Sequence, residues 1–109
     1  MLQQPNRDLV VILSNLFNNA IEGSSNVAES EIDLKIINTD TEFLISIQNT
    51  VSHNIEILNN CPPPSTKTRL GHGMGLQNII DILKKYDSAY LIDCHDHWFK
   101  VILSINKPT

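Results

Sequence analysis

The chain has 109 residues, of which 41% are hydrophobic and 18% charged, a composition typical of a single globular domain. Its formal net charge of −4, with no basic run, argues against a nucleic-acid partner. No apolar stretch reaches the roughly 18 residues of a membrane span, and two cysteines are too few for a disulfide framework. We therefore expect one domain over residues 1–109, in a reducing interior and without direct membrane contact.

The first predicted element is a helix that ends near Gly23. Apolar residues between Leu9 and Ala20 recur with the 3.6-residue period of a helix that buries one face. Asn6 or Asp8 is a candidate cap for its start, and Gly23 with the polar run behind it predicts its end.

Two strands should follow the helix, over residues 31–38 and 41–50. In "EIDLKIIN" and "TEFLISIQNT" apolar and polar residues alternate, which is the pattern of half-buried strands. The polar link 38–40 between them predicts a hairpin turn. Asn49 has the parity of Ile45 and Ile47, so its side chain should point towards the core.

The second half of the chain repeats this order after a long irregular segment. Residues 51–70 have no sustained period and contain three successive prolines, so we expect an extended loop. A helix is predicted over 75–86, and strands over 89–95 and 98–105 around a turn near Asp96. The expected fold is an α/β (α+β) two-layer sandwich, with a mainly antiparallel sheet and the helices on one face.

Glycine is concentrated immediately before the second predicted helix. Three of the four glycines lie in "GHGMGL", at Gly71, Gly73 and Gly75. A glycine turn that runs into a helix can present free N–H groups to a phosphate, or it can be a simple hinge. The pattern fits neither the dinucleotide fingerprint nor a Walker loop. A phosphate site and a simple hinge therefore both stay open as interpretations of these glycines.

Polar residues on the first predicted helix suggest a binding site. Asn15, Asn19 and Glu22 share one stripe of that helix. Amide oxygens suit Mg²⁺ with phosphate, but the same residues could be solvated surface groups. The inward Asn49 could bond its own backbone or accept a hydrogen bond from a ligand. In "CHDHW", Cys94, His95 and His97 lack a second ligand pair, so we expect no structural zinc there.

Three segments together resemble the ATP-binding domain of sensor histidine kinases, which has the Bergerat fold. "SNLFNNAIEGS" resembles the N-box of that family, "ISIQNT" stands where its first glycine box lies, and "STKTRLGHGMGLQNI" resembles the second. The order of motifs is most similar to AgrC-like quorum-sensing receptor kinases. The resemblance implies a mixed, mainly antiparallel sheet and an ATP lid at residues 51–70.

The resemblance also implies roles for individual residues. Asn19 would ligate Mg²⁺, Asn15 would lie beside the phosphates as a catalytic residue, and Glu22 would act in catalysis from a more distant position. Asn49 would accept from the adenine amino group, although most relatives have Asp-x-Gly where this chain has Asn49-Thr50-Val51. The remaining ATP-binding positions would be Thr66, Lys67, Gly71, His72, Gly73, Met74, Gly75 and Leu76. Among these, His72 would either contact a phosphate or be exposed in the turn, and Met74 would be a packing residue.

The implied function is that of a histidine kinase catalytic domain. Such a domain binds Mg²⁺-ATP and donates the γ-phosphoryl group to a histidine of a separate dimerisation domain. A response regulator would be an indirect partner. The resemblance implies that residues 1–109 belong to the cytoplasmic portion of a larger, membrane-anchored bacterial receptor kinase. The alternatives are an anti-sigma-type serine kinase of the same fold and an interaction module that binds no nucleotide.

Overall fold

The computed structural model of the protein describes residues 5–62 and 75–107, and the side chains from Arg7 onward within them. The elements occur in the predicted order of helix, two strands, helix and two strands. Their bounds are α1 Pro5–Gly23, β1 Ile32–Asn38, β2 Glu42–Thr50, α2 Gly75–Leu83, β3 Ser88–His95 and β4 Trp98–Asn106.

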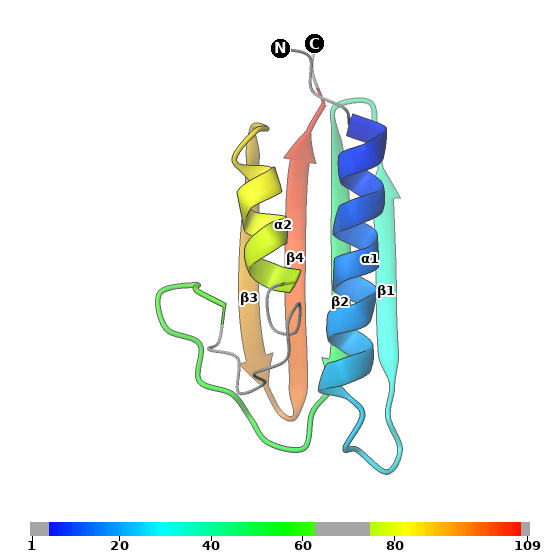
Figure 1. Ribbon diagram of the computed structural model, residues 1–109, viewed down its shortest axis with the longest axis vertical. Coiled ribbons are helices and arrows are strands. Elements are labelled where there is room, and N and C mark those ends of the chain that lie inside the picture. The colour runs from blue at the N-terminus through cyan, green and yellow to red at the C-terminus, as the bar shows by residue number, and fades with distance from the viewer. Residues whose placement is uncertain (1–4, 63–74, 108–109) are drawn as a thin grey trace.

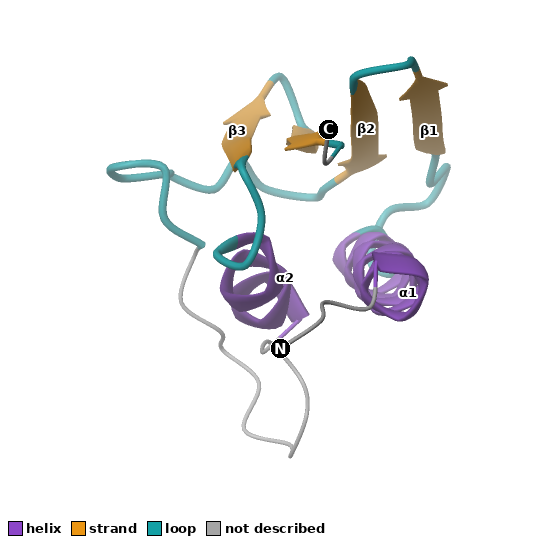
Figure 2. Ribbon diagram, turned by 90° about the horizontal axis from the view of Figure 1, so that it is seen from above, coloured by secondary structure: helices purple, strands orange, loops and turns teal. Residues whose placement is uncertain are grey.

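The described strands form one sheet in the order β1-β2-β4-β3, and every neighbouring pair is antiparallel. Both helices lie on the same face of this sheet, so the molecule has two layers (Figures 1 and 2). The predicted two-layer α+β fold is thus confirmed. Over the residues that the structure describes, the sheet has no parallel pair, so the expected mixed character is not seen there.

The core lies between the two central strands and the helices. Alternate residues of β2 and β4 point into it, as the period-2 pattern predicts. The helices contribute one apolar face each, with α1 and α2 packed side by side (Figure 2). The most buried large apolar residues are Ile12, Leu16, Ile45, Ile79 and Leu103.

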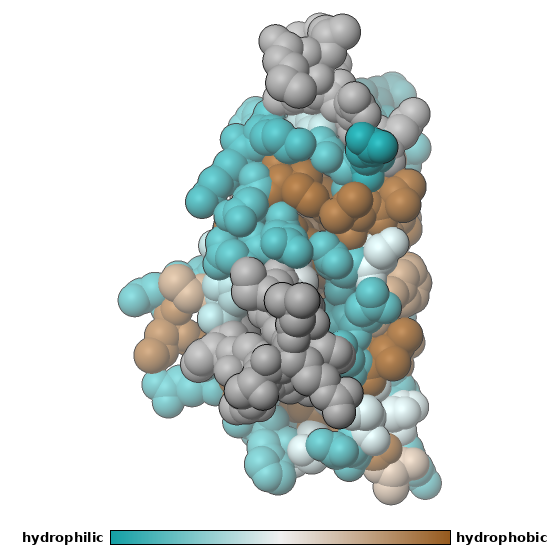
Figure 3. All heavy atoms as spheres, viewed as in Figure 1, coloured by the Kyte–Doolittle hydropathy of each residue, from teal (hydrophilic) through white to brown (hydrophobic). Residues whose placement is uncertain are grey.

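The prediction that β1 is a half-buried strand is wrong for most of its length. Ile32 and Ile36 remain 39% and 48% exposed, and only Leu34 packs against the core. The reason is position, because β1 is an edge strand and α1 packs chiefly on β2. With Phe17 and Ile21 of α1, these isoleucines are among the large apolar residues that stay exposed. Hydrophobic residues are visible along the α1 and β1 side of the molecule (Figure 3).

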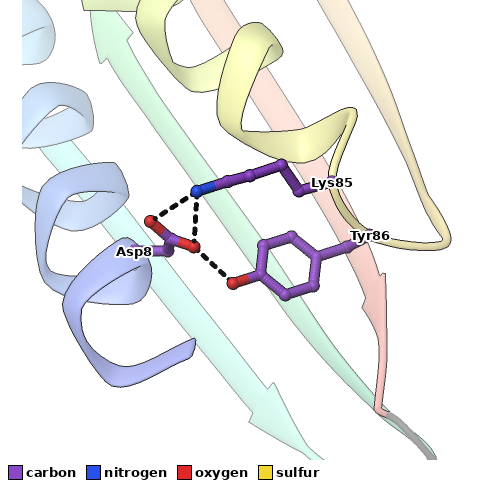
Figure 4. A network of polar contacts seen from close by, with 3 residues as sticks. All are labelled: Asp8, Lys85 and Tyr86. Carbon is purple, nitrogen blue, oxygen red and sulfur yellow. Dashed lines mark hydrogen bonds and ion pairs between the residues drawn. The ribbon is translucent and has the colours of Figure 1, made fainter. Parts of the chain in front are cut away.

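The prediction that Asp8 could cap α1 is wrong. The helix begins at Pro5, and Asp8 lies in its first turn with only 8% of its surface exposed. Its carboxylate accepts hydrogen bonds from Lys85 Nζ, 3.1 Å from Oδ1, and from the Tyr86 hydroxyl (Figure 4). The Nζ atom also lies 3.0 Å from Oδ2.

The Asp8 contacts change the ionisation of both partners. The Tyr86 hydrogen bond is the main cause that lowers the pKa of Asp8, and Lys85 adds to it against an opposing effect of burial. Burial first, and then the Asp8 carboxylate, raises the pKa of Tyr86 to about 12. The predicted helix 75–86 ends at Leu83, and the turn behind it brings Lys85 and Tyr86 to Asp8.

Neither described helix is long and apolar enough to cross a membrane.

Candidate nucleotide-binding site

Asn49 is the most buried polar residue of the described chain, with 2% of its surface exposed. β2 places its side chain on the helix-facing side, in line with the buried Ile45 and Ile47, as predicted. Its amide nitrogen donates to the Thr50 carbonyl oxygen at 3.1 Å. Within residues 5–62 and 75–107, nothing donates a hydrogen bond to its Oδ1. A buried acceptor without a partner is costly, so this oxygen is a candidate contact for a ligand or a water molecule.

Gly23 brings the end of α1 against Asn49. A Cβ atom added at Gly23 would lie 2.8 Å from Asn49 Nδ2, closer than real Cβ contacts allow. The sequence predicted this glycine only as a helix terminator. Its contact with Asn49 was missed because the two residues are far apart in the chain, and no local pattern reports such a neighbour.

The start of α2 lies against the middle of α1. A Cβ added at Gly75 would be 3.7 Å from the Asn15 backbone oxygen and 3.8 Å from Asn15 Cβ. The first N–H groups of α2 have no partner within the helix, and with the helix dipole they favour an anion. The structure therefore brings two predicted site residues, Asn15 and Gly75, into contact.

Asn19 and Glu22 complete the polar stripe of α1. Asn15, Asn19 and Glu22 are all half-buried. Asn19 is one helical turn from Asn15 and one turn from Gly23, on the same side of α1. The stripe thus extends from the start of α2 to the neighbourhood of Asn49, and it can offer amide oxygens to a hard cation such as Mg²⁺.

The second glycine box is only partly described. Leu76 is a core residue with a buried side chain, so only its backbone can meet a ligand from inside the helix start. The other predicted positions lie outside the described residues, namely Thr66, Lys67, Gly71, His72, Gly73 and Met74.

Comparison with known protein families shows to which family this chain belongs. A model of the GHKL domain matches residues 6–106, which is nearly the whole chain. The chain belongs to the GHKL domain family. None of the curated proteins matches it.

Solved structures show the same fold for this GHKL domain. The catalytic domain of histidine kinase ThkA, in a nucleotide-free form, matches with a TM-score of 0.71 and 23% identity, over 93% of this chain and 67% of that one. A blue-light-activated histidine kinase from Erythrobacter litoralis matches with 0.65 and 13%, over 90% and 42%. Acinetobacter baumannii AdeS, also a histidine kinase, matches with 0.63 and 16%, over 94% and 47%. The domain thus spans about two thirds of the ThkA domain and less than half of the other two.

Two asparagines attach the segment after β2 to the far edge of the sheet, and sequence reasoning missed both. Asn60 donates to Tyr90 O at 2.9 Å and accepts from Ile92 N at 2.7 Å, so its amide pairs with β3 as a strand would. Asn54 Oδ1 accepts from His97 N at 2.7 Å. Asn59 and Asn60 have positive φ, 55° and 56°, a conformation that asparagine tolerates better than most residues, so the two successive asparagines are the local signal that could have marked this turn.

The "CHDHW" segment of the GHKL domain forms the β3–β4 turn. Asp96 and His97 have positive φ, as expected for a tight hairpin. His95 pairs with Asp96 at 3.2 Å at the exposed tip, and Ile55 N donates to Cys94 Sγ at 3.2 Å. Among the described residues, no group of three or more potential metal ligands occurs.

Proposed function

We propose that this GHKL domain binds Mg²⁺-ATP as the catalytic domain of a sensor histidine kinase. The observation that supports this most directly is that no residue the structure describes donates a hydrogen bond to Oδ1 of the buried Asn49. An amide oxygen at this position can accept from the exocyclic amino group of adenine. The proximity of Asn15 to the start of α2 adds a second support, because it places this residue near N–H groups that have no partner within the helix.

The proposal gives Asn15, Asn19 and Glu22 of α1 separate tasks. Asn19 would ligate Mg²⁺ through its amide oxygen, and Asn15 would contact the phosphates next to the first N–H groups of α2. Glu22 would support Asn19 from the next turn. Thr66, Lys67 and the residues 71–74 would complete phosphate binding, as the family resemblance implies.

Bound Mg²⁺-ATP would supply the phosphoryl group, and the domain would contribute mainly positioning and charge neutralisation. The phospho-acceptor would come from elsewhere. Of the histidines that the structure describes, His53 lies in a loop, His95 ends β3 and His97 lies in the hairpin turn, so none of these three is on a helix that could dock on a second domain. The partner would be a histidine-containing dimerisation domain, followed by a response regulator. An AgrC-like quorum-sensing receptor at the membrane is the parent that the motif order favours.

Nucleotide binding can be tested by thermal unfolding with and without Mg²⁺-ATP. Ligand at 100 times Kd should add about 2.7 kcal/mol to the free energy of unfolding. Asn19→Ala should abolish the part of this effect that depends on Mg²⁺ and leave the apo stability nearly unchanged. Asn18→Ala is the matched control, because Asn18 is an exposed asparagine on the same helix. An unchanged transition in the wild type would reject the proposal and favour an interaction module.

Phosphoryl transfer needs a second assay. With labelled ATP the isolated domain should bind but gain no stable label, whereas addition of the parent dimerisation domain should give label on a histidine of that domain. Stable label on this chain, or label on a serine of a partner, would contradict the histidine kinase assignment.

A further inference from the structure

The two outer strands of the sheet differ in what lies against their free backbone edges. On β3, the Asn60 amide bonds Tyr90 O and Ile92 N, so it occupies the place where a further strand would bond. β1 is the opposite outer strand, and in the part of the chain that the structure describes it pairs only with β2 (Figure 1). An uncovered strand edge is a template for pairing with another chain. β1 is therefore the edge of this sheet that is open to such pairing.

The pairing of β1 with β2 decides which backbone groups of β1 point outward. Hydrogen-bonded and non-hydrogen-bonded pairs alternate along an antiparallel ladder. Thr50 N donates to Glu31 O, so the odd-numbered residues of β1 direct their backbone groups towards β2. The even-numbered residues direct their N–H and C=O groups to the open edge, and these are Ile32, Leu34 and Ile36.

The sequence of β1 is complementary to itself about Leu34. When two copies pair antiparallel with Leu34 opposite its own counterpart, Ile32 faces Ile36 and Asp33 faces Lys35 of the second copy. The outward backbone groups of the even-numbered residues then bond each other. The Asp33–Lys35 pairs become non-hydrogen-bonded pairs, in which facing side chains are closest. A symmetry axis at Ile32 or Ile36 would shorten the overlap and separate the two charges.

The two charged side chains lie where this pairing needs them. Asp33 and Lys35 are both exposed, on the sheet face that the helices leave uncovered. Gln48 Nε2 donates to Asp33 Oδ2 at 3.2 Å, which holds the carboxylate over the sheet and leaves Oδ1 able to accept from Lys35 of the second copy. A lysine on an edge strand ordinarily discourages pairing, but here each lysine meets a carboxylate.

The apolar side of β1 continues onto α1. Ile32 and Ile36 are exposed on the helix-facing side of β1, and Phe17 and Ile21 are exposed on α1. Phe17 follows Asn15 by two residues, so it lies about 200° around α1 from the contact with α2. This is the β1 side of α1, where hydrophobic residues are visible at the surface (Figures 2 and 3). Pairing about Leu34 would keep the helices of both copies on one face and bring these apolar surfaces together.

We propose that β1 is a dimerisation edge, to which a second copy of this chain adds antiparallel about Leu34. The product is one continuous sheet that spans both copies. A single strand pair with a few apolar side chains buries less area than a standard interface, so the expected Kd is about 1–100 µM. Such pairing does not depend on nucleotide binding.

Charge exchange tests the register of the dimer by analytical ultracentrifugation. Asp33→Lys and Lys35→Asp should each weaken self-association at least about tenfold, because like charges then face each other at both symmetric positions. An equimolar mixture of the two variants should form a heterodimer, since every facing pair is again of opposite charge. The double variant should recover the wild-type Kd to within about threefold. Asp40→Lys is the matched control, because Asp40 is exposed in the β1–β2 turn outside the paired segment.

Hydrogen exchange and a proline substitution test the backbone pairing. At ten times Kd, the Leu34 and Ile36 amides should exchange at least about twofold more slowly than at one tenth of Kd, whereas the inward Lys35 amide should not change. Ile36→Pro removes an outward N–H group and keeps the bonds to β2, so it should abolish the dimer while the monomer remains folded.

Several outcomes overturn the proposed dimer. One is a wild-type chain that stays monomeric at about 1 mM, ten times the weakest expected Kd. Another is exchange at Leu34 and Ile36 that does not depend on concentration. Dimers that persist in Asp33→Lys and Lys35→Asp, or variants that stay folded and monomeric when mixed, contradict the register. Rescue in the mixture and in the double variant separates lost pairing from lost folding.

Discussion

The contact between Asp8 and Tyr86 gives the sharpest stability prediction. Tyr86→Phe removes only the hydroxyl that donates to Asp8 Oδ2. Hydrogen bonds to charged groups contribute about 1.5–3 kcal/mol. Asp8 keeps Lys85 at 3.0 Å, so we expect the lower end, a loss of about 1–2 kcal/mol in the free energy of unfolding. For a domain of this size that corresponds to roughly 4–8 °C in Tm.

The same variant should change the pH dependence of stability at both ends. Folding lowers the pKa of Asp8 below its ordinary 3.8, so its contribution is full above that value and is lost as pH falls through the lower, folded pKa. Folding raises the pKa of Tyr86 from 10.0 to about 12, so that contribution is full below pH 10 and is lost between pH 10 and about 12. Tyr86→Phe should therefore flatten the acid limb and abolish the tyrosine part of the alkaline limb.

Urea unfolding at pH 3, 7 and 11 measures these effects. Tyr90→Phe is the matched control, because the Tyr90 hydroxyl makes no hydrogen bond to another residue that the structure describes. A cycle with Asp8→Asn should show that the two changes are not additive, as expected for partners in contact. The reasoning fails if Tyr86→Phe is as stable as the wild type at pH 7, or if the two variants add without coupling.

Three further predictions concern other parts of the molecule. Asn60→Ala should cost about 1–3 kcal/mol and speed hydrogen exchange at the Ile92 amide, and unchanged exchange would contradict its role as a strand substitute. Asn49→Asp, which restores the common family residue, should lower the free energy of unfolding by about 1–3 kcal/mol because a carboxylate oxygen replaces the donor to a carbonyl, and unchanged stability would contradict this. Ile45→Ala, at a side chain with 0% exposure, should cost about 2–5 kcal/mol in chemical unfolding, whereas Ile37→Ala, at 53% exposure, should cost under about 0.5 kcal/mol.

The fold could be predicted from periodicity because most elements bury one face. α1, β2, β4 and the start of α2 all show the expected spacing of apolar residues. β1 shows the same alternation and is nevertheless largely exposed. Alternation tells which side of a strand is apolar, but only the position in the sheet tells whether a helix covers that side.

The candidate site could be predicted only as far as local spacing reaches. Helical spacing places Asn15 and Asn19 on one stripe, and strand parity turns Asn49 inward. The residues that contact these asparagines are distant from them in the sequence. Asp8 satisfies the local rules for a helix start and yet bonds Lys85 and Tyr86, because tertiary contacts outweigh a capping preference.

α1 connects the separate contacts of this domain into one arrangement. Its first turn holds the residues after α2 through Asp8, its middle touches the first residue of α2 at Asn15, and its last residue touches Asn49 of β2. Contacts near both ends of α2 therefore fix the position of α2 along α1. Because the first residue of α2 and the side chain of Asn49 both lie against this one helix, their separation depends on the number of residues between Asn15 and Gly23. An inserted residue in that interval would rotate the remainder of the stripe by about 100° and move Gly23 away from Asn49.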